Sequence, residues 1–414
     1  MTPDVQPLNT ETTPTRRRWF RFSVRSLLIF ITLAACPLGW IAKQRSQSNF
    51  EHQIGKKLEE QGLSVFYLGP YDSWRLDSEH KPQGWWRDLA HEVLGGRISV
   101  VNDNIVHWVD LPHGHGQQGK RDTSECDLSP IAGLKNLLFL SIQHRYVNDL
   151  TPLAELNNLE RLWLTNTSVS DVSPIAGLKN LELLELRNKD LRDLTPLGGL
   201  KNLKWLTLSS TSISDLTPLA RLKKLETLDL LGGESVTDMT PLSGLKNLKS
   251  LSLSCTSASD LTPLAEQTDL QHLCLWETPV SDLTPLAGLH NLESLKLCFS
   301  PVHDLTPIAG LTNLKKLEIN DLPTRDLTPL AELNSLENLR LTNTSVNDIA
   351  SLAGLAKLKY LSLYGSPIRD LTSIGELKGL KELSLQKISY TLEQAKSLKK
   401  ALPNCRFSAY GMTD

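Results

Sequence analysis

The sequence predicts an α/β solenoid, a fold in which short repeated units stack and share one elongated core. Two observations predict it. An aspartate recurs every 22 residues, with one interval of 23, and ten of the twelve units carry the pattern Leu-x-x-Leu-x-Leu, with Ile142 or Ile319 in place of its last leucine in the other two. The twelve units start at Asp127, Asp149, Asp171, Asp193, Asp215, Asp238, Asp260, Asp282, Asp304, Asp326, Asp348 and Asp370, and the last ends at Thr391. Because each unit packs on its neighbours, a chain of 414 residues does not require several globular domains.

The leucines indicate one β-strand in each unit. In a representative unit, Leu295 and Leu297 alternate with Ser294, Lys296 and Cys298. Successive side chains of a strand point to opposite faces, so we expect the leucines to point inward and the other three outward. Neighbouring units would then pair as parallel strands about 4.8 Å apart.

A short helical turn is predicted near the start of each unit. In Thr284-Pro285, threonine is a favourable N-cap and proline suits the first helical position, which indicates a 3₁₀ or helical turn on the convex side. Ten of the twelve units carry this proline, and Ser351 and Ser373 replace it in the last two. The aspartate at the head of each unit is expected to accept a backbone N–H hydrogen bond in an Asx-type turn.

The units resemble the bacterial leucine-rich repeats of the internalin type, in which LxxLxLxxNxIxD and LTPLAxLTNL blocks recur. The resemblance covers about two thirds of the chain and implies a leucine-rich-repeat horseshoe with a parallel sheet on its concave side. The chain is also similar to membrane-anchored paralogues of planctomycete-type bacteria. The similarity lies in the order of its segments, which are an arginine-led N-terminus, a Trp-containing region and Thr-bearing repeats. Host-cell invasion is not implied, because no LPxTG-like sorting signal or immunoglobulin-like domain follows the repeats.

The repeats depart from the internalin pattern in two places. Hydroxyl residues replace the asparagine of that pattern, and we expect them to bond the turn backbone more weakly than asparagine would. They are Thr167, Thr211, Thr256, Thr278, Ser300 and Thr344. The extra residue of the 23-residue interval lies beside Gly232-Gly233, which predicts a small bulge.

The N-terminal segment predicts a membrane anchor. Residues 1–25 are rich in Thr, Pro and Arg and are expected to be disordered and basic, whereas residues 26–42 form an uncharged apolar run. That run is long enough for a single transmembrane signal anchor. Its arginine-rich leading side should stay cytoplasmic, so the protein is expected in the inner (cytoplasmic) membrane with its repeats extracytoplasmic.

Two alternatives to an uncleaved anchor remain for the same segment. A cleaved secretory signal peptide shares its basic start and apolar middle. A lipoprotein signal would place the acyl chains on Cys36, because residues 33–36 (Leu-Ala-Ala-Cys) resemble a lipobox.

The regions flanking the repeats are expected to cap the solenoid. Residues 50–125 form a predicted α/β N-terminal cap, with helices at 51–61 and 84–94 and strands at 63–68, 97–101 and 105–111. Residues 392–414 form a predicted C-terminal cap. Its helix should place Leu392, Ala395 and Leu398 inward behind a Thr391–Gln394 capping box, and a short strand should follow at 405–407.

The outward strand positions on the concave sheet are the predicted binding site, because the fold presents them in rows on a rigid scaffold. Trp, Tyr and Arg are the residue types that contribute most to interfaces. The partner-binding residues predicted on this basis are Phe139, Arg161, Trp163, Trp205, Trp276, Phe299, Arg340, Tyr360 and Tyr364. For each of them, the alternative is packing on neighbouring strands, which stabilises the sheet alone.

The predicted function is a protein–protein interaction module, with a cell-envelope glycan as a further class of ligand. The chain has 44 Lys plus Arg against 46 Asp plus Glu, so its charge does not favour nucleic-acid binding. Catalytic, cofactor and metal sites are not predicted, since the sequence contains no GxSxG, HExxH or phosphate-loop motif. A purely structural envelope scaffold is one alternative function.

Two further alternatives concern possible chemistry outside the strand rows. Residues 50–125 could contain a small catalytic or metal-binding domain, whose candidate residues are His91, Glu92, His107, His113 and His115. Cys274 and Cys298 fall on adjacent predicted strands, with Cys255 one strand further back, so a disulfide or a soft-metal site is an alternative there. An offset of two positions disfavours a direct disulfide, and scattered buried or half-buried thiols are the default expectation.

Overall fold

The computed structural model describes residues 65–68, 98–101, 105–111, 127–143 and 145–410. The chain divides into two units, residues 1–50 and 51–414, and the described residues all belong to the second. The predicted segments 1–25 and 26–42, the predicted helices 51–61 and 84–94, and the histidines considered at positions 91, 113 and 115 lie outside the described residues. Within the described part of the chain, no helix combines the length and apolarity needed to cross a membrane.

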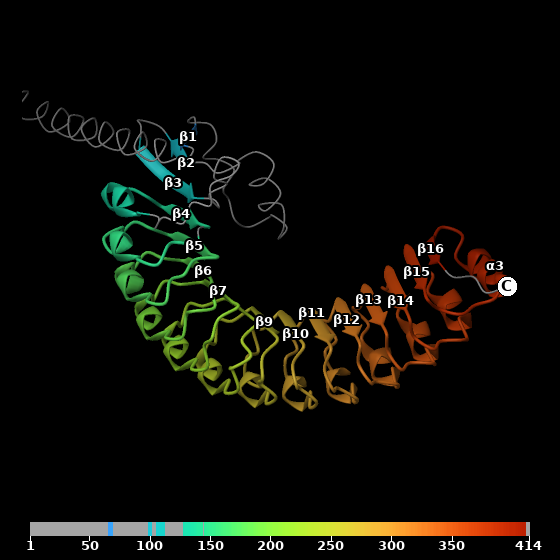
Figure 1. The fold of residues 1–414 in the computed structure, drawn as a ribbon. Helices are drawn as coiled ribbons and strands as arrows, with labels where there is room; N and C mark the ends of the chain where they lie inside the picture. The colour runs from blue at the N-terminus through green and yellow to red at the C-terminus, as the bar shows by residue number, and fades with distance from the viewer. Residues whose placement is uncertain (1–64, 69–97, 102–104, 112–126, 144, 411–414) are drawn as a thin grey trace, which may run out of the picture. The chain divides into compact units, whose positions relative to one another are not determined.

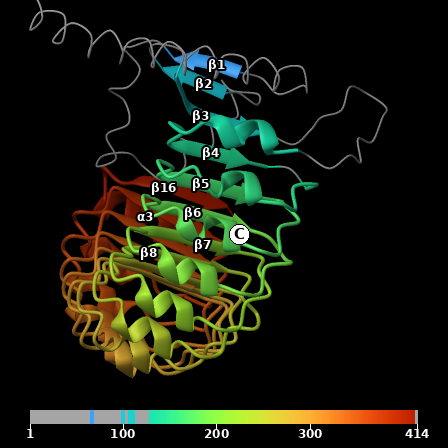
Figure 2. The same ribbon diagram turned by 90° about the vertical axis from the view of Figure 1, so that its left-hand side faces the viewer.

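Among the described residues, sixteen strands form one sheet in chain order, and the predicted strand repeat is confirmed (Figures 1 and 2). Strands β2 and β3 pair antiparallel, and the other neighbours pair in parallel. The strands are β1 (Val65–Leu68), β2 (Ile98–Val101), β3 (Ile105–Leu111), β4 (Phe139–Ile142), β5 (Arg161–Thr165), β6 (Leu183–Arg187), β7 (Trp205–Ser209), β8 (Thr227–Leu231), β9 (Ser250–Ser254), β10 (His272–Trp276), β11 (Ser294–Cys298), β12 (Lys316–Asn320), β13 (Asn338–Thr342), β14 (Tyr360–Tyr364), β15 (Glu382–Gln386) and β16 (Arg406–Tyr410).

Twelve 3₁₀ turns alternate with the strands from β4 onward. In Figure 1 the strands of the repeats lie along the inner, concave side of the arc and the turns along its outer, convex side. The turns are η2 (Ser129–Gly133), η3 (Thr151–Leu153), η4 (Ser173–Gly177), η5 (Thr195–Gly199), η6 (Thr217–Arg221), η7 (Thr240–Gly244), η8 (Thr262–Leu264), η9 (Thr284–Leu286), η10 (Thr306–Ile308), η11 (Thr328–Glu332), η12 (Ala350–Gly354) and η13 (Thr372–Glu376).

One continuous hydrophobic core lies between the sheet and the turns. Leu295 pairs with Leu273 and Leu317 on the neighbouring strands, and at most 2 % of each of these side chains is exposed. The predicted inward leucines are therefore confirmed. Each strand from β4 to β15 contributes the same two inward positions, so the apolar side chains of successive units stack on one another along the solenoid.

The extra residue of the 23-residue interval does not interrupt the sheet, so the predicted bulge is wrong. Leu228 of β8 pairs with Leu251 of β9 without a shift of register. The additional residue lies in a turn after β8, in which the N–H of Val236 donates to the carbonyl oxygen of Gly233 at 2.9 Å. A connecting turn accepts an added residue more easily than a strand whose leucines must stay in register.

The Asx-type role of the repeated aspartate is confirmed in all twelve units. Each aspartate accepts the backbone N–H two residues further on, at 2.7–2.9 Å. The predicted N-cap role of Thr284 is wrong, because η9 begins at Thr284 itself and Leu283 is its N-cap. Asp282 already satisfies the N–H of Thr284, so the threonine can enter the turn.

These aspartates make stability depend on acidic pH. The pKa of eleven of them lies below the usual 3.8, first because a Ser or Thr hydroxyl two residues on donates to the carboxylate, and second because the backbone N–H does. A carboxylate with a lowered folded-state pKa stabilises the fold above its unfolded pKa, and this contribution is lost as pH falls through the folded value. We therefore expect the urea midpoint of unfolding to hold above about pH 5 and to fall steeply below about pH 4.

A single variant tests the origin of this pH dependence. Asp282→Asn keeps a hydrogen-bond acceptor but removes one titrating carboxylate. Its urea midpoint should fall less between pH 5 and 3 than the wild-type midpoint does. An unchanged pH dependence in this variant would contradict the assignment to the aspartate column.

Asparagine side chains link the units, at the asparagine of the final Asn-Leu in the LTPLAxLTNL block of the internalin pattern. The Nδ2 of six asparagines donates to a backbone carbonyl oxygen of the preceding unit, at 2.6–2.9 Å. They are Asn158, Asn180, Asn202, Asn247, Asn291 and Asn313, each directly before the first leucine of its strand segment. These amides satisfy carbonyl groups in the loops that enter the strands.

Four of the six predicted hydroxyls at the expected asparagine position do not bond the turn backbone, whereas Ser366, at the same position of a later unit, accepts the N–H of Thr344 at 3.3 Å. The side-chain oxygens of Thr167, Thr256, Thr278 and Ser300 are buried and have no hydrogen-bond partner among the residues that the structure describes. A hydroxyl is shorter than an asparagine amide and carries one donor rather than two, so it does not reach the same carbonyl groups. Thr344 differs, because its Oγ1 lies 2.8 Å from the Oγ of another buried hydroxyl residue, Ser366.

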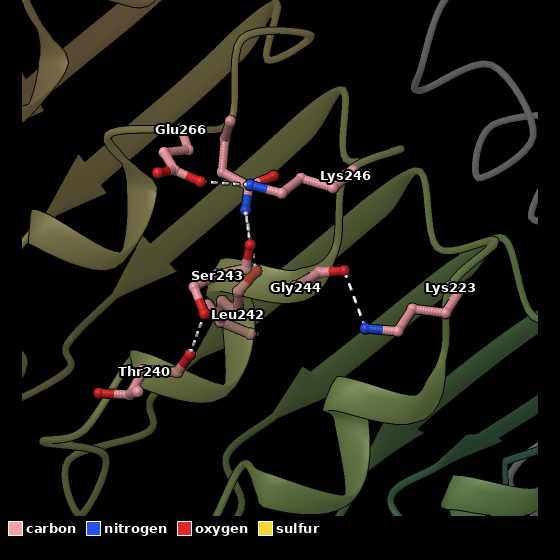
Figure 3. Close-up of polar contacts among 8 residues, drawn as sticks. Lys223, Thr240, Leu242, Ser243, Gly244, Lys246 and Glu266 are labelled. Carbon is pink, nitrogen blue, oxygen red and sulfur yellow. Dashed lines mark hydrogen bonds and ion pairs between the residues drawn. The ribbon is translucent and has the colours of Figure 1, made fainter.

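Polar side chains also join neighbouring units on the convex side. Lys246 forms a 3.0 Å ion pair with Glu266 of the next unit (Figure 3). Gln267 is 1 % exposed, and its Nε2 donates to the carbonyl oxygens of Leu242 and Ser243 at 3.0 Å. The buried glutamine supplies donors to the end of η7, whereas the exposed ion pair contributes little to stability.

The C-terminal cap is formed by helix α3 (Leu392–Ala401) and by β16. The predicted capping box is confirmed, since Thr391 Oγ1 accepts from the N–H of Gln394 at 3.2 Å and Gln394 Oε1 accepts from the N–H of Thr391 at 2.8 Å. Leu398 is buried and Ala395 packs on the core. The predicted inward position of Leu392 is wrong, because 57 % of this first helical residue is exposed and the helix meets the core one turn later.

Candidate functional site on the concave face

Three outward positions on each repeat strand form rows along the concave face, and the residue after the strand forms a fourth row. In β10, His272, Cys274 and Trp276 are the outward residues, and Glu277 follows. The same positions recur one strand further in register. The concave face is therefore a grid whose rows run across the strands.

The fourth row is called the ridge here, and its backbone is unusual. Most of its described members have φ between 48° and 75°, the left-handed region that glycine adopts most easily. They are Asn166, Ser210, Gly232, Cys255, Glu277, Phe299, Asp321, Asn343, Gly365 and Lys387. A bulky side chain costs about 1–2 kcal/mol in this conformation. Phe299 and Glu277 therefore keep their side chains where glycine would be less strained.

The predicted aromatic and arginine residues near the N-terminal end of the repeats pack on the sheet. The guanidinium of Arg161 lies 5.2 Å from the ring centroid of Phe139, and Trp163 is half-buried. Trp205 is half-buried too, and its Nε1 donates to Thr207 Oγ1 at 3.0 Å. Trp205 thus fits the alternative to partner binding, in which a predicted residue packs on neighbouring side chains and stabilises the sheet.

Trp276 and Phe299 form an exposed aromatic pair at the centre of the concave face. Their ring centroids lie 5.2 Å apart with the planes tilted by 58°. Trp276 is 37 % exposed and Phe299 is 44 % exposed, although both rings are large and apolar. We call this pair the central patch. It offers contiguous apolar area to solvent, as interaction sites do.

The predicted residues near the C-terminal end form a separate group. Tyr360 of β14 is 43 % exposed, and Lys387 Nζ lies 5.0 Å from the ring centroid of Tyr364. Arg340 is exposed on β13. The nine predicted residues therefore fall into separate groups on the concave face, which lie on β4–β5, on β7, on β10 with the residue after β11, and on β13–β14.

Acidic and amide residues also surround the central patch, although none of them is among the nine residues predicted to bind a partner. Glu318 accepts a hydrogen bond from Asn320 Nδ2 at 3.0 Å and lies 3.7 Å from Lys296 Nζ. Glu277 and Asp321 are ridge residues on either side of Phe299. An alignment of the residue that follows each strand would have revealed the ridge, since the 22-residue spacing places Glu277, Phe299 and Asp321 at the same repeat position.

The predicted outward position of Cys298 is confirmed, but this position is not open to solvent. Its place in β11 is an outward one, yet its side chain is fully buried. Its register neighbours are Trp276 and Asn320, and Asn320 Nδ2 lies 3.3 Å from its Sγ. Burial, as the largest cause, raises the pKa of the Cys298 thiol to about 12, so the thiol is neutral near pH 7.

The cysteines of the repeats are free thiols. Cys274 pairs in register with Lys296, and Cys298 pairs with Trp276, which confirms the offset of two positions. In the described ranges, from 65 to 410 with gaps, His, Cys, Asp and Glu residues form no group of three that could hold a metal ion.

Comparison with known proteins agrees with the repeat geometry. A family model described as leucine-rich repeats (2 copies) matches residues 201–244. The crystal structure of an internalin (InlF) from Listeria monocytogenes is 31 % identical, covers 65 % of this chain and 79 % of that chain, and gives a TM-score of 0.60. The chain belongs to the internalin-type leucine-rich-repeat proteins. A search of curated protein sequences found no match.

Two further structures show the same fold at lower identity. A leucine-rich-repeat protein of Leptospira interrogans is 24 % identical, with a TM-score of 0.62, and covers 69 % of this chain and 81 % of that chain. The functional domain of InlJ from Listeria monocytogenes, which includes a cysteine ladder, is 18 % identical and gives a TM-score of 0.58. The match covers 75 % of this chain and 64 % of that chain. Leucine-rich-repeat proteins of this kind are generally interaction modules rather than enzymes.

Proposed function

We propose that this internalin-type protein binds a protein partner on its concave face and that the central patch is the anchor of the interface. The observation that carries the proposal is the exposure of Trp276 and Phe299 side by side on a rigid sheet. Large aromatic residues near the centre of an interface contribute most of its binding energy. Phe299 also carries its large ring at a ridge position, where glycine would be less strained.

The sequence also suggests the cellular location of the repeats. We propose that residues 26–42 anchor the chain in the inner membrane with the repeats extracytoplasmic, and that Cys36 lipidation is the alternative anchor. Membrane fractionation of the Cys36→Ala variant distinguishes the transmembrane anchor from the lipid anchor. The transmembrane anchor predicts an unchanged membrane fraction, and release of the protein would favour the lipid anchor.

Removing both rings of the central patch should weaken partner binding at least about tenfold. The partner would be captured by crosslinking in intact cells, identified by mass spectrometry, purified and titrated against the full chain. Trp276→Ala combined with Phe299→Ala is the test variant. Trp205→Ala is the matched control, because this half-buried tryptophan is already bonded to Thr207 and should matter less.

The outcomes separate binding from a structural role. Equal affinity of the double variant and the wild type would sink the central patch as the anchor. An equal loss in Trp205→Ala would move the anchor toward β7. If no partner depends on either site, the alternative of a purely structural envelope scaffold is favoured.

A further inference from the structure

We propose that the central patch accepts a basic segment of the partner, with an arginine or lysine stem lying on the rings and its charged head between two carboxylates. The proposal rests on the proposed function, because it specifies the chemistry of the partner at the same site. The two carboxylates belong to Glu277 and Asp321, and the rings to Trp276 and Phe299.

Backbone geometry places one carboxylate on each side of Phe299. Glu277, Phe299 and Asp321 are consecutive ridge residues with φ of 50°, 53° and 52°. The N–H of Glu277 donates to the carbonyl oxygen of Cys298, and the N–H of Phe299 to that of Asn320, each at 2.9 Å, so the strand ladder continues into the ridge. Equal backbone angles on adjacent strands about 4.8 Å apart point the three side chains the same way.

Neutral groups accompany both carboxylates. Glu277 accepts a hydrogen bond from the Cys255 thiol at 3.1 Å, and Asp321 accepts one from Asn343 Nδ2 at 3.1 Å. The hydrogen bond to Glu277 is the largest cause that raises the pKa of Cys255 to about 11, so this thiol is uncharged near pH 7. Across the described part of the chain, neither carboxylate forms an ion pair with Lys or Arg.

The positive charges nearby belong to another row. Lys296 lies on the middle outward position of β11, 3.7 Å from Glu318, which neutralises it in part. Arg340 occupies the same row on β13 and pairs in register with Glu318. The middle row is thus close to balanced, whereas the ridge beside the rings carries two uncompensated negative charges.

A basic side chain matches both features of this surface. The methylene stem of lysine or arginine covers apolar area while its head remains polar. A cation near an aromatic face is attracted by the negative face of the ring, and the flanking carboxylates add an attraction that salt screens. An acidic segment at the same place would be repelled by Glu277 and Asp321.

A display library of random linear peptides, selected on the immobilised full chain, provides the test. Selected peptides should carry Arg or Lys beside an apolar residue, and their affinity should decrease with added salt. The test variant, Glu277→Gln with Asp321→Asn, should lose about tenfold in affinity for these peptides. The matched control, Glu332→Gln with Glu376→Gln, removes two carboxylates at the ends of convex turns η11 and η13 and should stay within about twofold.

The two proposals fail in different ways. If the carboxylate variant binds as well as wild type while Trp276→Ala with Phe299→Ala loses binding, the basic partner is refuted and the anchor stands. Selected peptides that depend on the rings but carry no basic residue would also refute the basic partner alone. If neither variant changes binding, or if the library yields no peptide that depends on the rings, both proposals are refuted.

Discussion

Replacing Leu295 with alanine is expected to lower the free energy of unfolding by about 3 kcal/mol. Leu295 is fully buried at the centre of the solenoid and pairs with Leu273 and Leu317. The truncation removes apolar burial and leaves a cavity in a core that neighbouring units share, so those units lose contacts as well. Urea unfolding followed by circular dichroism measures the difference.

The same substitution at an exposed leucine is the control. Leu392 is 57 % exposed at the start of α3, so Leu392→Ala should change the free energy of unfolding by about 0.5 kcal/mol or less. Equal losses in the two variants would mean that the burial pattern does not determine stability here.

Leucine periodicity predicted the fold closely because it repeats one local rule. The alternation around Leu295 determines which side of β11 is inward, and parallel pairing with neighbouring units then follows from the constant spacing. The capping box of Thr391 and Gln394 was equally predictable, since both partners lie within one turn of sequence.

Properties that depend on neighbouring units were harder to predict. Alternation gives Cys298 an outward position, but its burial depends on the side chains of the strands beside it. Leu392 has helical spacing, yet it lies one turn before the helix meets the core.

The candidate site was predicted in part for the same reason. Trp276 and Phe299 were chosen by residue type, and their pairing required the strand register. The ridge was missed because positive φ is usually recognised from glycine, whereas most ridge residues here carry side chains. Glu277 and Asp321 become relevant once the ridge places them beside Phe299.

Two threonine-to-valine substitutions should change stability in opposite directions, with a difference of about 3 kcal/mol between them. Thr324 is fully buried, and its hydroxyl has no hydrogen-bond partner among the described residues. The units on either side hold Val302 and Val346 at the same repeat position, both fully buried. Thr324→Val removes an unpaired polar group without leaving a cavity, so it should raise the free energy of unfolding by about 1 kcal/mol.

Thr344→Val is the counterpart, because here the hydroxyl has a partner. Thr344 Oγ1 lies 2.8 Å from Ser366 Oγ, and both residues are buried. Valine would leave the Ser366 hydroxyl with one hydrogen bond fewer in the core, so the free energy of unfolding should fall by about 2 kcal/mol. Urea unfolding of both variants decides the matter. A loss of stability in both variants would show that the Thr324 hydroxyl has a hydrogen-bond partner in solution. The buried hydroxyls of Thr256 and Thr278 would then be expected to have such partners too.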